Sequence, residues 1–244
     1  MPAGGPSCAV NRGHLIATRL LEFAVMSEQV HILSEHPSLI SQVLAEIRDE
    51  SLQQDSMRFR RNLERFGEMA AYEISKKLEW EERAVRTPLG EARCLRLRRQ
   101  PVLANILRAG LPLHQGLLNY FDHAENAFIS AYRKHEEGSD AFEVEIEYLS
   151  SPPVAGKTVI LCDPMLATGS SMVLAWKALL ERGMPDELHV VSVIASDEGL
   201  AFVREHLPTT ATYWLGAVDH ELTPRKYIVP GLGDAGDLAY GAKD

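Results

Sequence analysis

The residues from Asp163 to Ser171 carry the groups best suited to chemistry in this chain. They follow a short apolar run, Thr158 to Cys162, and end in Thr168-Gly169-Ser170-Ser171. This ending supplies backbone N–H groups and three hydroxyls where a helix is expected to begin, and the positive end of the helix dipole adds to them. The stretch therefore predicts a site for a phosphate monoester. A plain N-cap turn is the alternative interpretation of these residues taken alone.

Two further features narrow the ligand that this loop would hold. No Lys precedes the Ser pair, as a Walker A loop requires for the outer phosphates, so a triphosphate is not expected. Asp163 lies about one sugar length from the phosphate cradle, where a carboxylate accepts hydrogen bonds from ribose hydroxyls. Ribose 5-phosphate fits this pair of groups.

A second string, Gly231-Leu232-Gly233-Asp234-Ala235-Gly236, has the form G-x-G-x-x-G. A dinucleotide fingerprint lies between the first strand and helix of a βαβ unit, with an acid about twenty residues further on. The printed sequence has only eight residues after Gly236. We therefore interpret this string as a binding loop of another kind.

The elements that must position these loops alternate along the chain. Helical spacing over Pro37 to Arg48 and Ser56 to Leu78 predicts two N-terminal helices, and Val85 to Leu97 is strand-like. Further strands are predicted over Val102–Leu107, Phe128–Tyr132, Thr158–Cys162, Leu188–Ala195 and Thr212–Ala217, and further helices over Leu113–Phe121, Met172–Arg182 and Gly199–His206. Strict alternation in FEVEIEYL, with Phe142, Val144, Ile146 and Tyr148 on one side, predicts a hairpin with one wet face. Strands that alternate with helices predict an α/β fold with a central, mostly parallel sheet flanked by helices.

Composition excludes several classes of protein. The net charge of -9 argues against a general grip on nucleic acid, which needs clustered Lys and Arg. No run approaches the roughly 20 apolar residues of a membrane span. The three cysteines are widely spaced and indicate a reducing cytoplasm, with Cys162 as a buried small hydrophobe, and the nine histidines form no metal-binding cluster. Residues 1–25 are expected to be a poorly ordered or accessory extension, and residues 26–244 a single domain.

Two long motifs carry a resemblance to a known family. The string Asp163-Pro164-Met165-Leu166-Ala167-Thr168-Gly169-Ser170-Ser171 resembles the loop of uracil phosphoribosyltransferases that binds 5-phosphoribosyl 1-diphosphate (PRPP). YIVPGLGDAGD, about sixty residues later, resembles their uracil-binding tail, and HPSLISQVLAEIRDE and ILRAGLP add weaker matches. The resemblance covers nearly everything after Ser34. It implies a type I phosphoribosyltransferase fold, with a small hood built from the chain's ends and a β-hairpin arm.

The resemblance also implies roles for individual residues. Arg108 and Arg133 resemble PRPP contacts that stabilise the leaving diphosphate together with Mg²⁺, which PRPP itself would bring, so no protein ligand to the metal is expected. By resemblance, Ile228, Gly233, Asp234 and Ala235 contact uracil, and Asp234 also lies near PRPP. The residues expected to be catalytic are Asp234, Arg108 and Arg133. The family further implies a homodimer or higher homo-oligomer and GTP as an effector.

Uracil recognition by such a tail has a simple physical basis. Uracil presents an N3–H donor between two carbonyl acceptors, which a backbone C=O and backbone N–H groups can read without any side chain. Cytosine has the opposite polarity and would be rejected. The glycines at 231, 233 and 236 would let the main chain approach the flat base. The implied reaction converts uracil and PRPP to UMP and diphosphate in pyrimidine salvage.

The sequence departs from the family pattern at three places and leaves two alternatives. Ser170 stands where most relatives have Gly, Leu238 where they have Arg, and Lys134-His135 where an acid is usual. One alternative is a non-catalytic regulator of pyrimidine genes that senses PRPP or nucleotides. The other is a phosphoribosyltransferase for a different base.

Overall fold

The fold is that of a computed structural model, described here for residues 29–135 and 142–242, with the backbone alone for 131–135 and 142–145. The N-terminal extension expected over residues 1–25 lies outside these ranges. No helix in the described ranges has the length and apolar character needed to cross a membrane.

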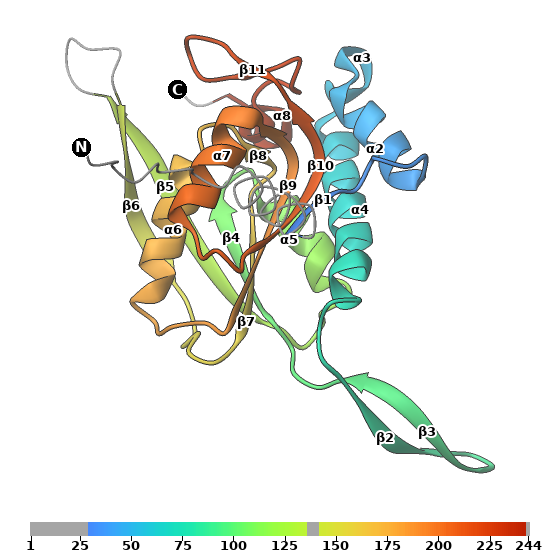
Figure 1. Ribbon diagram of the computed structural model, residues 1–244. Coiled ribbons are helices and arrows are strands. Elements are labelled where there is room, and N and C mark those ends of the chain that lie inside the picture. The colour runs from blue at the N-terminus through green and yellow to red at the C-terminus, as the bar shows by residue number, and fades with distance from the viewer. Residues whose placement is uncertain (1–28, 136–141, 243–244) are drawn as a thin grey trace, which may run out of the picture.

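The centre of the molecule is an eight-stranded sheet in the order β1-β10-β9-β7-β4-β5-β6, with β8 paired to β9 (Figure 1). The strands are β1 (Val30–Ile32), β4 (Val102–Leu107), β5 (Glu125–His135), β6 (Phe142–Ser150), β7 (Thr158–Cys162), β8 (Met165–Leu166), β9 (Glu187–Ser196) and β10 (Thr212–Asp219). All pairs are parallel except β5 with β6. The mostly parallel sheet predicted from the sequence is confirmed.

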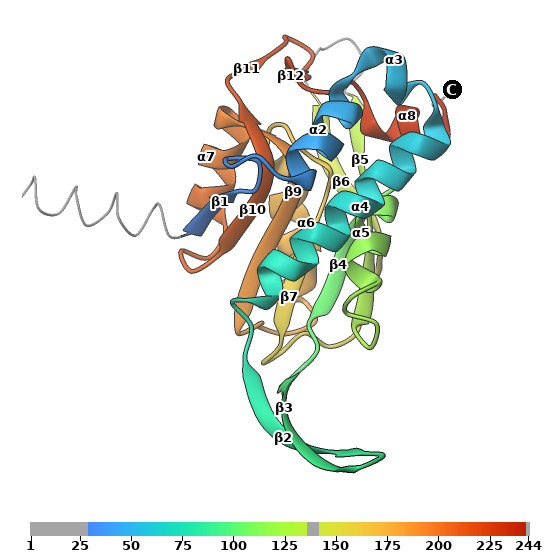
Figure 2. The ribbon, with the colours of Figure 1, turned by 90° about the vertical axis from the view of Figure 1, so that its right-hand side faces the viewer.

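Helices cover both faces of the sheet, as the alternating pattern predicts. On one face lie α2 (Leu39–Arg48), α3 (Glu50–Gln53), α4 (Ser56–Ser75) and α5 (Leu111–Leu118), and on the other α6 (Ser170–Leu180) and α7 (Asp197–His206), as Figure 2 shows. The buried apolar residues form two clusters, one on each face of the sheet. The predicted spacing in the second N-terminal helix is confirmed, because Phe59, Leu63 and Phe66 are buried in the first cluster.

A separate two-stranded sheet projects from the body as an arm, made of β2 (Trp80–Thr87) and β3 (Gly90–Leu97) (Figure 2). The strand-like stretch predicted over Val85 to Leu97 is therefore two strands, and Pro88-Leu89 forms the turn between them. Pro disfavours a continuous strand because it lacks an N–H, and it favours the first central position of a turn.

The predicted hairpin of β5 and β6 is confirmed. One of the β6 residues predicted to face the core does not do so. Tyr148 was predicted to face the core and is instead 54% exposed, while Leu149 packs against the second cluster. The register of the pair shifts between Ser130 and Ala131, where one extra residue interrupts the alternation. A β-bulge of this kind turns the following side chains to the other face.

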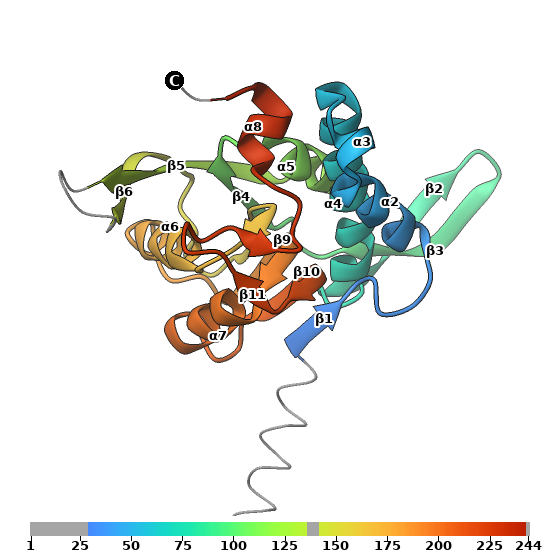
Figure 3. The same cartoon turned by 90° about the horizontal axis from the view of Figure 1, so that it is seen from above.

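The chain ends in three short elements above the carboxyl edge of the sheet: β11 (Glu221–Leu222), β12 (Ile228–Val229) and α8 (Ala235–Tyr240). Seen from above, α8 lies close to α4 and α5 (Figure 3). Together with α2 and α3 these elements form the hood, which therefore comes from both ends of the described chain. The sequence did not predict α8, because a six-residue helix that contains Gly236 has almost no helical signal of its own.

The buried His189, which lies with His31 against Trp214, predicts how the stability of the fold depends on pH. His31 stacks on Trp214 at 4.3 Å, and the Trp214 Nε1 donates to His189 Nδ1 at 3.2 Å. Burial, followed by the charges of His31 and Lys77, lowers the pKa of His189 to about 4. A group with a lowered pKa contributes its full stability above the unfolded pKa, here 6.5, and loses that contribution as the pH falls towards 4.

We therefore expect urea denaturation to show a free energy of unfolding that falls between pH 6.5 and pH 4, by roughly 3 kcal/mol from this residue. The variant His189→Gln should lose most of this slope. His206→Gln, at an exposed position, should keep it. Identical slopes in the wild type and in His189→Gln would contradict the assignment.

Candidate active site

The carboxyl ends of the parallel strands bring the predicted site residues to one edge of the sheet. Register pairs Asn105 of β4 with Cys162 of β7, so the loop that begins at Arg108 lies next to the loop that begins at Asp163. On the other side of β7, Ser196 of β9 is paired with Asp219 of β10. Open α/β sheets bind their ligands at this edge. The hood stands over the same edge (Figure 1).

The loop after β7 has the geometry of a phosphate cradle. Gly169 caps α6 with a φ of 79°, and a Cβ there would lie 2.8 Å from Val203 Cγ1. Both the positive φ and the close approach require glycine. The Thr168 hydroxyl lies 3.1 Å from the Ser170 hydroxyl, and the Ser170 N–H points to it at 3.4 Å. Ser170 thus contributes a hydroxyl to this turn.

The side chains of the cradle divide between the core and the ligand side. Pro164 and Leu166 are buried, and Leu166 belongs to the second cluster, so the side chains of these two residues serve packing. Thr168, Ser170 and Ser171 are half-buried. Met165 and Ala167 are also half-buried and pack against the first cluster, so the accessible polar side chains of the predicted site are the three hydroxyls and Asp163.

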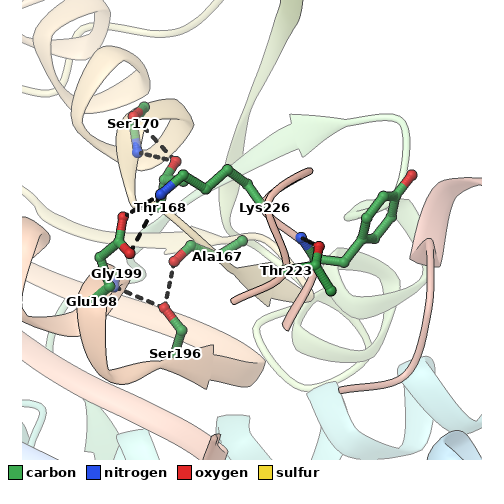
Figure 4. A network of polar contacts seen from close by, with 9 residues as sticks. Ala167, Thr168, Ser170, Ser196, Glu198, Gly199, Thr223 and Lys226 are labelled. Carbon is green, nitrogen blue, oxygen red and sulfur yellow. Dashed lines mark hydrogen bonds and ion pairs between the residues drawn. The ribbon is translucent and has the colours of Figure 1, made fainter. Parts of the chain in front are cut away.

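The start of α7 contacts the cradle through Ser196, its N-cap residue, and Gly199 in its first turn. The sequence did not predict this contact. Figure 4 shows the Ser196 Oγ bonded to the carbonyl of Ala167 at 2.5 Å and accepting the Gly199 N–H at 2.8 Å. Gly199 has no space for a side chain, because a Cβ there would collide with the Ala167 carbonyl. Ser196-Asp197-Glu198 is an N-cap pattern that would have placed the start of α7 at Asp197 rather than at Gly199.

Lys226 joins the hood to this side of the cradle. It lies between β11 and β12, and its Nζ reaches Glu198 in the first turn of α7 at 3.0 Å (Figure 4). Lys226 has a φ of 63°, which is unusual for a residue other than glycine. The hood therefore meets the phosphate side of the site through a charged contact.

Cys162 and Asp163 stand where β7 ends. Cys162 is fully buried, as predicted, and burial raises the pKa of its thiol, an effect to which the neighbouring Asp163 carboxylate adds. A thiol held in its protonated form is a poor nucleophile. Asp163 is half-buried and its N–H donates to the Val191 carbonyl at 3.1 Å. Of these two residues, the Asp163 carboxylate is therefore the group available to a ligand.

Arg108 lies directly against the C-terminal tail. Its Nη2 donates to Asp237 Oδ1 and to the Gly241 carbonyl, each at 2.8 Å. A Cβ on Gly236 would lie 3.6 Å from Arg108 Nε, so the first turn of α8 rests on the arginine. The other predicted arginine, Arg133, is in β5, next to β4, and its side chain lies outside the described part of the structure.

The tail itself is built on glycines and a buried apolar anchor. Gly231 and Gly233 have φ values of 57° and 90°, whereas Gly236 lies inside α8 and serves close packing instead. Ile228 and Ala235, two of the predicted uracil contacts, are buried as whole residues in the first cluster. Asp234 is exposed and accepts the N–H groups of Gly236 and Asp237 at 2.8 and 3.0 Å, which makes it the N-cap of α8.

An ion pair that sequence reasoning missed anchors this tail. Arg48 at the end of α2 forms a two-pronged contact with Asp219 of β10, with both distances 2.8 Å. The same pair grips Gly231, because Arg48 Nη1 donates to its carbonyl at 3.1 Å and Asp219 accepts its N–H at 2.9 Å. Burial raises the pKa of Asp219, but the hydrogen bonds from Arg48 and Gly231 outweigh this effect and leave the pKa below its ordinary value.

Comparison with known proteins agrees with this geometry. The sequence model of the family described as uracil phosphoribosyltransferase matches residues 33–242. A curated uracil phosphoribosyltransferase from Porphyromonas gingivalis is 53% identical over 88% of this chain and 99% of its own length. One from Thermococcus gammatolerans is 39% identical over 85% and 92%. The solved structure of the AQ2163 protein from Aquifex aeolicus superposes with a TM-score of 0.77 and 34% identity, covering 87% and 98% of the two chains.

These matches extend beyond the two motifs to the hood and the arm. The strand order, the helices on both faces and the position of the hood agree with the type I phosphoribosyltransferase fold predicted from the sequence, and that prediction is confirmed. The chain belongs to the uracil phosphoribosyltransferase family.

Proposed function

We propose that this protein transfers the 5-phosphoribosyl group from PRPP to uracil and releases UMP and diphosphate. The observation that carries the proposal is the meeting of two unlike sites at one edge of the sheet. A phosphate cradle at the start of α6 lies beside the Arg108 loop, and a glycine-rich tail that is exposed at Gly233 and Asp234 rests on that loop. Transfer to a base requires both sites within one substrate length of each other.

The phosphoribosyl half of the site would be held by the loop after β7. We infer that the main chain from Asp163 to Ser171 and the hydroxyls of Thr168, Ser170 and Ser171 bind the 5-phosphate, while the Asp163 carboxylate accepts the ribose hydroxyls. Arg108, with Arg133 from the neighbouring strand, would bind the diphosphate. As the bond from C1 to diphosphate breaks, negative charge grows on the departing oxygens, and the arginines stabilise it more in the transition state than in the ground state.

The base half would be read by the tail. Ile228 and Ala235 are almost fully buried, so the accessible part of the tail is Gly233 and Asp234, whose backbone groups would read N3–H and the two carbonyls. Gly233 is exposed, and the nearest atom to a Cβ there would be Gln53 Oε1 at 3.8 Å, so the chain is open on that side. The Asp234 carboxylate would contact both substrates. The attack needs no covalent enzyme intermediate, which agrees with the protonated thiol of Cys162.

We propose that Mg²⁺ enters the site as a companion of PRPP. Within the described residues there is no group of three or more His, Cys, Asp or Glu side chains that could hold a metal. Bound to the oxygens of PRPP, the ion would neutralise charge on the diphosphate. The free thiols Cys94 and Cys162 support the reducing cytoplasm predicted as its compartment. GTP as an effector stays a prediction of the family resemblance.

The test of the proposed function is an assay with PRPP, Mg²⁺ and one base from a panel of uracil, cytosine, hypoxanthine and orotate. UMP should form with uracil, and the other bases should react far more slowly. Faster reaction with another base would show a phosphoribosyltransferase of different specificity. PRPP binding without any transfer would favour a regulator.

We also propose that the protein self-associates through its arm. A lone two-stranded hairpin is only marginally stable in water, yet β2 and β3 pack against each other outside the body. Trp80, Leu89 and Leu95 on this arm are 47%, 100% and 69% exposed. Large apolar side chains this exposed on a lone hairpin are expected to be covered by a second copy of the chain.

The double variant Leu89→Glu/Leu95→Glu should therefore shift the protein to a smaller species in sedimentation velocity runs. Met184→Glu, at an apolar position that is 67% exposed elsewhere on the surface, serves as the control and should leave the species unchanged. A wild type that sediments as a monomer would contradict the role assigned to the arm.

A further inference from the structure

The contact between Arg108 and the tail joins two parts of the site that the proposed reaction uses for different substrates. The loop after β4 would bind the diphosphate of PRPP, and the tail would bind uracil. Asp237 in α8 and Arg108 are 129 residues apart in sequence, yet Arg108 Nη2 and Asp237 Oδ1 are 2.8 Å apart. The same nitrogen also reaches the Gly241 carbonyl at 2.8 Å. One guanidinium nitrogen thus contacts both the first turn and the C-cap residue of the short helix.

The hydrogen bonds that the Arg108 guanidinium makes within the described ranges involve only one of its three nitrogens. Nη2 carries two hydrogens, and Asp237 and Gly241 provide an acceptor for each. Nε–H is buried and has no hydrogen-bond partner among the described residues. Because the group is planar, fixing Nη2 at two points also fixes the directions of Nη1 and Nε. Neither of these two nitrogens donates a hydrogen bond to the described part of the tail.

The surroundings make this more than a surface ion pair. The side chain of Arg108 is 29% exposed, and the first turn of α8 lies against it, where Gly236 leaves space for Nε. A second arginine, Arg60 of α4, holds the other end of α8 through the Ala239 carbonyl at 2.6 Å. The tail therefore has a defined position on Arg108. A displacement of the tail must change the orientation of the Arg108 side chain, and the reverse also holds.

We propose that Asp237 is a positioning residue, which orients Arg108 for the diphosphate and so couples the occupancy of the diphosphate site to that of the base-reading tail. The inference rests on the proposed function and deepens it. A base that binds to the tail and fixes its position also fixes the orientation of Arg108 through Asp237. A diphosphate bound to Arg108 in turn favours the docked position of the tail. Such coupling is reciprocal by thermodynamic necessity.

Binding of inorganic diphosphate with Mg²⁺, measured by calorimetry with and without uracil, tests the coupling without turnover. In the wild type, uracil should tighten diphosphate binding several-fold. In Asp237→Ala this gain should disappear, and in Asp237→Asn, which keeps an acceptor oxygen but loses the charge, it should be reduced. Glu73→Gln, which removes the partner of an exposed lysine on α4, is the matched control and should behave as the wild type.

Steady-state kinetics provide the second readout. Asp237→Ala should raise the KM for PRPP roughly tenfold, because a charge-assisted contact to the binding arginine is lost. In an Arg108→Ala background the same substitution should have almost no further effect on that KM. Thermal unfolding of Asp237→Ala should resemble that of the wild type, since the pair is partly exposed.

Three results would overturn the inference. They are an unchanged KM for PRPP in Asp237→Ala, additive effects of the Arg108 and Asp237 substitutions, and equal coupling in the wild type and Asp237→Ala. A wild type that forms no UMP would instead contradict the proposed function, and the calorimetric coupling would then still decide whether Asp237 links the two segments.

Discussion

Replacement of Asp234 by alanine is expected to abolish turnover while the fold stays intact. Asp234 is exposed at the start of α8, on the tail that rests against Arg108, where its carboxylate would contact both substrates. Loss of such a charged contact in a transition state lowers kcat by about 100-fold or more. The measurement is the rate of UMP formation from PRPP and uracil, with circular dichroism to confirm the fold.

The structure adds a second role for Asp234 that this experiment must separate from the first. Its side chain caps α8 by accepting the N–H groups of Gly236 and Asp237. Loss of a cap costs about 1 kcal/mol and could by itself disturb the tail. Asn caps helices as well as Asp does, so Asp234→Asn keeps the helix but removes the charge. We expect Asp234→Asn to be nearly as inactive as Asp234→Ala, and near-wild-type activity would assign the residue to capping alone.

The second large effect is expected at the ion pair beneath the tail. Arg48→Ala leaves the Asp219 carboxylate, which is 8% exposed, without its cation, and frees the Gly231 carbonyl. Removing one partner of a well-buried pair costs 3–5 kcal/mol, and the partial exposure of Arg48 reduces this to about 2 kcal/mol. We expect the thermal midpoint to fall and the KM for uracil to rise roughly tenfold, with a much smaller change in the KM for PRPP.

Two further variants sharpen this prediction. Arg48→Lys keeps the charge but cannot form the two-pronged contact, so it should recover only part of the uracil affinity. Arg58→Ala breaks an exposed ion pair with Glu46 and is the control that should leave both KM values unchanged. A similar loss of affinity for uracil and PRPP in Arg48→Ala would show general destabilisation instead of an effect on the tail.

The local patterns in the sequence accounted for the framework of the fold and for the phosphate loop. Buried runs such as Val102–Leu107 and Thr158–Cys162 are strands within the predicted bounds, because continuous apolar stretches of this length fit a sheet covered on both faces. Gly169 and the hydroxyls after it also lie where their spacing predicted, at the start of a helix. Such features depend on neighbours only a few residues away.

The predictions failed where the outcome depended on packing. The bulge that exposes Tyr148 depends on how β6 meets β5, and the helix α8 is stable because it docks on Arg60 and Arg108. Neither the bulge nor the docking of α8 has a signal in the sequence of its own segment. Short elements gain most of their stability from tertiary contacts, so a propensity pattern does not reveal them.

The sequence by itself determined the chemistry available to this protein: a phosphate loop at the start of a helix, and a glycine-rich tail suited to main-chain recognition. Only the tertiary structure decided which partners hold those two segments. Arg48 and Asp219 are 171 residues apart in sequence, and Asp237 meets Arg108 only after the chain has folded back over the sheet. An arginine or an aspartate in isolation is compatible with any solvated surface, and its role arises from the oppositely charged group that the fold brings to it.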